Sequence, residues 1–199
     1  MKKVVFGLFV LLGLSMFLPS CGYNSMVQKE EAIEGAWAQV ENQYQRRSDL
    51  IPNLVKTVES AAIREQDILE GVVSARAKAT QVTIDPKNLS QEELDKFDAA
   101  QGELSQALGR LLMITENYPQ LQSIQGYTSL MDELAGTENR IATERMRFNE
   151  TVQDYNTYIR KFPANIIASI FGFDSKAYFK AKEGADVVPD LEFSNLKEE

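Results

Sequence analysis

The stretch RRSDLIPNLV, Arg46 to Val55, decides the fold, because it places a proline inside a segment with helical periodicity. Proline has no backbone N–H and its ring clashes with the preceding turn, so it kinks or breaks a helix. Two interpretations are open. Ser48 or Asp49 could cap a new helix with Pro52 in its first turn, which would reverse the chain at Ser48. Alternatively, one long helix bends at Pro52.

Apolar residues on both sides of Pro52 recur at steps of three and four, the spacing of helices that pack in bundles. Two further series of this kind cover residues 94–111 and 124–162. The first series runs from Ile33 to Val82 and contains Ile33, Trp37, Val40, Tyr44, Ile51, Leu54, Val58, Ala61, Ile68, Val72, Ala75, Ala79 and Val82. The pattern predicts an all-α chain.

Turn chemistry divides the chain further. The segments Thr83–Leu89 and Asn117–Pro119 are typical of loops, and Ser90 with Glu93 three residues later forms a capping-box pattern. The prediction is an antiparallel up-and-down bundle of four long helices. The alternative is a three-helix bundle with a long first helix kinked at Pro52.

The N-terminus has the form of an export signal. Lys2 and Lys3 precede Val4–Leu18, fifteen residues without a charge, which is the length of a signal-peptide apolar region and short for a membrane-spanning helix. The run closes with Leu18-Pro19-Ser20-Cys21, which resembles the bacterial lipobox. In that class the cysteine receives a diacylglyceryl group and the chain is cut before it.

Cys21 is therefore predicted as the lipidation site, carrying chains such as palmitate. Two or three acyl chains on one residue give stable membrane anchoring. The predicted organisation is a lipoprotein signal peptide over 1–20, a helical bundle over 21–173 and an extended C-terminal tail over 174–199. Because Cys21 is the only cysteine, the mature chain has no disulfide.

Charge and composition exclude several functions. Removing Lys2 and Lys3 takes the net charge from −8 to −10, and an acidic chain without a basic cluster is a poor nucleic-acid binder. There is no histidine, the commonest general base and metal ligand, and no phosphate-binding glycine loop. Glu30, Glu31 and Glu34 come closest to a metal site, but a solvated acidic face explains them better. We predict no enzyme, no metal and no cofactor.

Polar residues at positions that continue the apolar spacing form a candidate buried polar seam. Such groups are costly unless paired, and they commonly fix the register of a bundle. We expect Arg47 and Arg145 each to pair with a seam glutamate on a neighbouring helix; a polar groove for a peptide or small ligand is the alternative. The candidate residues are Glu30, Arg47, Glu65, Gln101, Glu138 and Arg145.

The segment Phe162–Phe173, FPANIIASIFGF, concentrates apolar side chains after Pro163. It is interpreted as a lid on the end of the bundle, with contact to a membrane or a partner as the functional alternative. That alternative needs the reversal at Ser48, which would bring the segment to the anchored side. The candidate contact residues are Ile166, Ile167, Ile170, Phe171 and Phe173.

A series of ordered motifs resembles the LemA family over roughly residues 23–193. The resemblance implies an up-and-down helical bundle, which favours the reversal at Ser48, and it implies no established activity. Two features depart from the family: the lipobox replaces an uncleaved transmembrane helix, and Arg64-Glu65 stands where relatives often have a histidine before the glutamate. The matching motifs are Glu30–Ala32, Ala36–Gln43, Arg46–Val55, Ala75–Ala77, Asn117–Leu121, Thr137–Ala142, Arg147–Asn149, Val152–Asn156, Phe162–Asn165 and Phe171–Phe173.

The sequence thus predicts a lipid-anchored protein of the bacterial cell envelope with an adaptor or scaffold role. Its partners would be the membrane, through the anchor, and another envelope protein or a second copy. Gly22 after the cysteine is not the aspartate that retains lipoproteins at the inner membrane of enteric bacteria, so an outer membrane is expected if the cell has one. No acidic run follows directly, which favours the periplasmic leaflet. Self-assembling membrane shaping, suggested by magnetosome-associated relatives of the family, is the alternative, and an unrecognised envelope enzyme is the second alternative.

Overall fold

The computed structural model describes residues 2–60 and 65–180, with the backbone alone described for residues 2–21, 122 and 125. All regular secondary structure within these residues is helical, which confirms the predicted all-α class. The helices are α1 (Lys2–Ser60), α2 (Gln66–Gln81), the short 3₁₀ helix η1 (Pro86–Asn88), α3 (Gln91–Thr115), α4 (Pro119–Gln122), α5 (Gln125–Arg160) and α6 (Ala164–Phe171).

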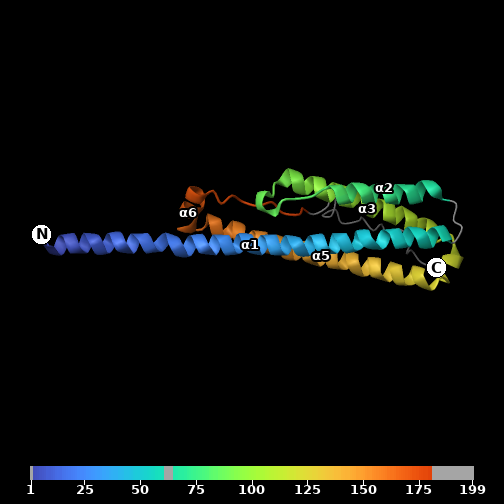
Figure 1. The fold of residues 1–199 in the computed structure, drawn as a ribbon, viewed down its shortest axis with the longest axis horizontal. Helices are drawn as coiled ribbons and strands as arrows, with labels where there is room; N and C mark the ends of the chain where they lie inside the picture. The colour runs from blue at the N-terminus through green and yellow to red at the C-terminus, as the bar shows by residue number, and fades with distance from the viewer. Residues whose placement is uncertain (1, 61–64, 181–199) are drawn as a thin grey trace, which may run out of the picture.

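The helices form an elongated rod (Figure 1). α1 and α5 pack side by side in opposite directions, and α2 and α3 make a second pair that lies along them. Ion pairs between α1 and α5 show that the two helices are antiparallel. Lys29, early in α1, pairs with Asp154, late in α5, whereas Arg46, later in α1, pairs with the earlier Glu133. α6 packs against α1 and α5 at one end of the packed helices, beyond which the N-terminal part of α1 projects alone, and the C-terminal end of α1 lies at the other end.

The predicted loops and helix cap are confirmed. α2 ends at Gln81 and α3 begins after Ser90, whose hydroxyl accepts a hydrogen bond from the Glu93 backbone N–H at 3.2 Å. The Glu93 carboxylate accepts in return from the Ser90 N–H at 3.3 Å, which completes the capping box.

The predicted reversal at Ser48 is wrong. α1 passes through Ser48 and Pro52 as one helix and ends at Ser60, after which α2 runs back along it. The alternative prediction is correct that one helix continues through Pro52, but its three-helix bundle is not observed, because α1 ends at Ser60 and α2 packs back along it as a separate helix. The apolar spacing keeps its phase across Pro52 because both sides belong to one helix and face one core.

A contact from α2 explains how α1 tolerates Pro52. In an uninterrupted helix the N–H of residue 52 would donate to the carbonyl of Ser48, and proline removes that donor. The side chain of Arg76 supplies a replacement: its Nε donates to the Ser48 carbonyl oxygen at 2.8 Å. A buried helix carbonyl thus keeps a partner, supplied by tertiary structure rather than by the helix itself.

We expect this contact to couple Arg76 to Pro52. Arg76→Ala should lower the free energy of unfolding by about 1–2 kcal/mol, because the Ser48 carbonyl loses its donor. In a Pro52→Ala background the residue at 52 regains an N–H, so the same change should cost less than half as much. A double-mutant cycle followed by urea unfolding measures the coupling. Lys78→Ala, which removes only an exposed ion pair with Glu103 from α2, is the control and should cost less than about 1 kcal/mol. An equal cost in both backgrounds would show that Arg76 acts through other contacts.

The core is divided into two apolar clusters along the rod. The first surrounds Trp37, whose ring lies 5.3 Å from that of Phe97 on α3 and 5.5 Å from that of Phe148 on α5. The second extends from Leu50 on α1 toward the far end and includes Leu111 of α3 and Leu134 of α5. The interval between them is polar, and it contains the first candidate site.

Candidate functional site

Arg47 lies at the centre of a polar layer that separates the two apolar clusters. Its side chain is 2% exposed. Nη1 donates to the Glu138 carboxylate at 2.7 Å and to the Ser105 hydroxyl at 3.0 Å, and Nη2 donates to the Gln101 side-chain oxygen at 2.6 Å. The Gln101 amide nitrogen donates in turn to the Ala79 carbonyl at 3.2 Å. The layer therefore joins α1, α2, α3 and α5 at one level.

The layer satisfies most of its polar atoms internally. The Arg47 Nε and the neighbouring Ser48 hydroxyl are its buried atoms without a hydrogen-bond partner. The Arg47 guanidinium is almost fully buried, and its donors are used by Glu138, Ser105 and Gln101. Buried polar residues of this kind set the register of packed helices, so the arrangement is suited to aligning four helices rather than to catalysis.

Three of the residues predicted for the buried polar seam belong to this layer. The structure brings Arg47, Gln101 and Glu138 together, and Arg47 pairs with the seam glutamate on α5. Glu138 itself does not face inward: its side chain is 48% exposed, and the buried position beside it belongs to Thr137. The carboxylate reaches Arg47 from the edge of the bundle, where water still solvates it.

Arg145 has a different partner from the predicted one. Its Nη1 donates to the Asp98 carboxylate of α3 at 2.6 Å, so the expected pairing with a seam glutamate is wrong. Its guanidinium also lies 4.2 Å from the centre of the Phe179 ring. The Tyr44 hydroxyl is a weaker neighbour at 3.4 Å. Burial raises the pKa of Tyr44 above its ordinary value, although both Arg145 and Arg47 oppose that rise.

The two remaining seam candidates lie apart from the layer. Glu30 is half-buried near the α6 end, where it forms an ion pair of 2.8 Å with Lys176. Glu65 precedes α2 as its cap residue and makes no side-chain cap hydrogen bond, so the inward helical position predicted for it is wrong. The prediction extended the three-and-four spacing of the first apolar series to Glu65. That extension fails because α1 ends at Ser60, before Glu65.

A C-terminal strap, residues 174–180, completes the first apolar cluster. Asn156 of α5 donates to the Lys176 carbonyl and accepts from the Lys176 N–H, both at 2.9 Å. Asn149 makes the same pair of bonds, both at 2.9 Å, with Phe179. Seven residues of helix advance about 10 Å, which matches three residues of extended chain. The two asparagines therefore hold the strap as a neighbouring strand would.

The strap places Phe179 in the core. Its ring lies 5.9 Å from Trp37 in a stacked arrangement and 5.5 Å from Phe148, and it is 6% exposed. Tyr155 donates to the Asp174 carbonyl at 3.0 Å. Burial, followed by the nearby charges of Glu30 and Asp174, raises the pKa of Tyr155 to about 12, so this hydroxyl stays protonated and donating at neutral pH.

Sequence reasoning missed the strap contacts. Asn149 and Asn156 each stand directly after a core residue, Phe148 and Tyr155, and repeat at seven residues. That spacing of two amides along one helix edge was the available signal. Nothing in the local pattern identified Phe179 as their target, because its burial depends on the chain's return from α6.

The apolar segment after α5 forms the second candidate site. α6 buries Ala164 and Ala168 against the bundle and turns large side chains outward. Of the predicted contact residues, Ile166, Ile170 and Phe171 are 51%, 71% and 55% exposed. Ile167 and Phe173 instead pack partly against the first cluster. Phe162, which the prediction omitted, is the most exposed large apolar residue of the described chain at 81%.

α6 lies beside the start of the described α1 side chains. The Tyr23 ring is 5.0 Å from that of Phe171 and 5.6 Å from that of Phe173. A Cβ at Gly22 would lie 2.7 Å from the Ile167 Cδ1, so the glycine permits this close approach. The segment therefore reaches the N-terminal side of the bundle through the turn after Ser60, without the reversal at Ser48 on which the prediction depended. The side chain of Cys21 itself lies outside the described residues.

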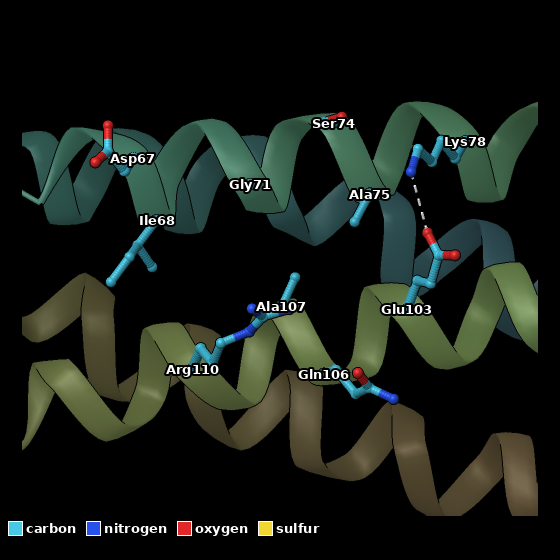
Figure 2. Close-up of a pocket in the computed structure, with 10 residues that line it drawn as sticks. All are labelled: Asp67, Ile68, Gly71, Ser74, Ala75, Lys78, Glu103, Gln106, Ala107 and Arg110. Atoms are coloured by element: carbon cyan, nitrogen blue, oxygen red, sulfur yellow. Dashed lines mark hydrogen bonds and ion pairs between the residues drawn. The ribbon is translucent and has the colours of Figure 1, made fainter.

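The described part of the rod has hollows between its helices. One, with a volume of about 370 Å³, lies between α2 and α3, where the Lys78–Glu103 ion pair of 3.2 Å bridges the two helices (Figure 2). Its other charged residues are Asp67 and Arg110. A second hollow of about 730 Å³ lies between α1 and α2 and is lined by Val55, Leu69, Val73, Ala77, Ser74, Gln66, Glu59 and Glu70.

No cluster of three or more histidine, cysteine or acidic side chains that could hold a metal occurs in the part of the chain described here. Two of the three glutamates considered for such a site form ion pairs instead: Glu30 with Lys176, and Glu34 with Lys87 at 3.7 Å.

Over the described residues, no helix combines the length and apolar character needed to cross a membrane.

Comparison with known proteins identifies relatives over most of the chain. The model of the LemA family matches residues 36–193. Magnetosome proteins MamQ 1 and MamQ 2 of Paramagnetospirillum magneticum are each 32% identical over 189 residues, covering 85% of this chain and 70% of the relative. Magnetosome protein MamQ of Magnetospirillum gryphiswaldense is 32% identical over 181 residues, covering 82% of this chain and 66% of the relative.

Proposed function

Because the chain belongs to the LemA family, we propose that it is a lipid-anchored envelope protein with a non-catalytic adaptor or scaffold role. In this proposal the signal peptide is removed before Cys21, the cysteine carries the lipid, and α1, α2, α3 and α5 form an antiparallel four-helix stalk. The stalk stands on the periplasmic face of the outer membrane in a cell that has one.

The observation that carries the proposal is the continuity of α1. The helix runs without interruption from the lipobox region to Ser60. At 1.5 Å per residue the part from Gly22 to Ser60 extends about 58 Å. A lipid on Cys21 would thus attach directly to the first turn of a long rigid helix, which holds the far end of the rod well away from the bilayer.

The chemistry of the rod supports a binding role over a catalytic one. Its most buried charge, Arg47, serves helix alignment. The hollow between α1 and α2 at the far end offers a partner the side chain of Val73, which is 51% exposed, above the buried Val55 and Leu69. Membrane shaping by self-assembly is the second candidate, favoured by the magnetosome names of the relatives.

The first test is the lipid itself. Mass spectrometry of the N-terminal peptide, from membranes of the native host, is expected to show diacylglyceryl on Cys21. Cys21→Ala should abolish the modification and leave the precursor uncut. Ser20→Ala, which keeps a small residue before the cysteine, is the matched control and should be processed normally. Unmodified Cys21 in the membrane fraction would contradict the anchor.

The second test addresses the role. Crosslinking in native membranes, followed by mass spectrometry, compares the wild type with Cys21→Ala. The adaptor proposal expects a partner captured by the lipidated form alone. Self-crosslinks alone, dependent on Cys21, would favour the membrane-shaping candidate. Turnover of an envelope substrate by the purified protein would favour the unrecognised enzyme.

A further inference from the structure

The outer face of α6, together with Phe162 just before the helix, presents an apolar surface to solvent, which we call the apolar foot: Phe162, Ile166, Ile170 and Phe171. The four side chains are 81%, 51%, 71% and 55% exposed and come from ten consecutive residues. Isolated apolar residues on a protein surface are ordinary, but a concentration of this kind marks a site that meets an apolar partner.

The apolar foot cannot turn inward. Ala164 and Ala168 occupy the inner face of α6, where their small side chains let the helix lie close to α1 and α5. Ile167 rests against Gly22, and Phe171 contacts Tyr23 edge-on at 5.0 Å between ring centres. Gly172 ends the helix in a left-handed conformation with φ of 75°, which returns the chain toward the bundle. The orientation of α6 is therefore fixed by packing.

We propose that the apolar foot inserts into the lipid bilayer at the headgroup–acyl boundary. This inference rests on the proposed lipid anchor at Cys21. The residue that follows, Gly22, touches α6 through Ile167. Acyl chains on Cys21 enter the bilayer within one residue of that contact, so α6 is held at the membrane surface with its apolar side chains exposed. Short amphipathic helices in this setting bury their apolar face about 5–10 Å into the boundary region.

The charged residues next to the apolar foot are consistent with contact to a lipid bilayer. Arg160 and Lys161 are exposed directly before Phe162, where their cationic groups can meet lipid phosphates. The chain without residues 1–20 carries a net charge of −10, so the remainder of the rod is repelled by anionic headgroups. Attraction at one end and repulsion elsewhere orient the rod away from the membrane plane.

A lipid surface fits the foot better than a second copy of the chain. A stable protein interface buries roughly 800 Å² on each partner, more than four partly exposed side chains on a short helix supply. Insertion into lipid needs no such area, because the acyl chains on Cys21 already hold the protein at the membrane.

The test places an environment-sensitive fluorophore on Ile170→Cys in the full acylated chain, reconstituted in vesicles of phosphatidylethanolamine and phosphatidylglycerol. Nitroxide quenchers attached to the lipid chains report contact with the bilayer. The control is Met113→Cys, a 68% exposed apolar residue near the far end of α3. We expect quenching at position 170 to be at least about threefold stronger than at 113, given insertion of 5–10 Å. Ile166→Cys provides a second labelled position, and circular dichroism verifies that each variant is helical.

Two results would overturn the proposal. Equal quenching at 170 and 113 would mean that α6 does not touch the bilayer. Shielding of position 170 from both the lipid quencher and aqueous iodide would mean that protein covers it, either a second copy or a partner. Failure of the anchor is recognised separately: the wild-type chain would then react with the thiol reagent at Cys21 and would not float with vesicles.

Discussion

Arg47→Ala is expected to lower the free energy of unfolding by about 2–5 kcal/mol, the range for truncating a large buried side chain. The change deletes four hydrogen bonds to three residues of α3 and α5, two of them to Gln101. It also leaves the Gln101 side-chain oxygen buried without a donor and opens a void between the two apolar clusters. Equilibrium unfolding in urea, followed by circular dichroism, measures the loss.

The neighbouring residue supplies a matched control. Arg46 also pairs with a glutamate of α5, Glu133, at 2.7 Å, but both side chains are 47% exposed. Arg46→Ala should therefore cost less than about 1 kcal/mol, as exposed ion pairs do. The two arginines have equal charge, are adjacent in sequence and pair with the same helix, but only Arg47 is buried and bonded to α3 as well.

A double variant distinguishes two contributions of Arg47 to stability, its buried hydrogen-bonded charge and the volume that its side chain fills. Arg47→Met with Gln101→Leu fills the layer with apolar atoms and leaves no polar side chain of that pair unsatisfied, so it should recover at least half of the stability lost in Arg47→Ala. If Arg47→Ala and Arg46→Ala were equally mild, the polar layer would not be a determinant of stability.

Phe179→Ala is expected to cost about 3–5 kcal/mol, the usual range for deleting a buried phenylalanine ring. Phe179 stacks on Trp37, contacts Phe148 and lies beneath the Arg145 guanidinium. Removing the ring leaves a void in the first apolar cluster and weakens the side-chain anchor of the strap. The hydrogen bonds from Asn149 and Asn156 would remain available, but they would hold a segment without a buried side chain.

The single tryptophan of the chain reports this change directly. Trp37 is 1% exposed, so its fluorescence should shift to longer wavelength in Phe179→Ala as water reaches the indole. Phe171→Ala is the control: that ring is 55% exposed, and its loss should change stability by less than about 1 kcal/mol and leave Trp37 emission unchanged. An unshifted emission in Phe179→Ala, with unchanged unfolding, would show that the strap is not part of the core.

The candidate sites were only partly predictable. Apolar spacing located the polar seam, because a charged residue at a core position breaks a visible pattern, and Arg47 and Gln101 are indeed buried. The partner of Arg145 was not predictable, since Asp98 lies on another helix and its distance depends on how α3 and α5 are aligned. The same holds for Phe179, which reaches Trp37 only because α6 returns the chain along α5.

The sequence by itself determined the all-α class, the loop positions and the cap of α3, because these follow from local propensity, spacing and turn chemistry. Tertiary structure alone decided what happens at Pro52. Local rules allowed a break or a continuous helix there, and the carbonyl that proline leaves without a donor is satisfied by Arg76, twenty-eight residues away on α2. A helix can continue through a proline when a donor from another part of the fold satisfies that carbonyl. Such a donor is known only once the helices are packed.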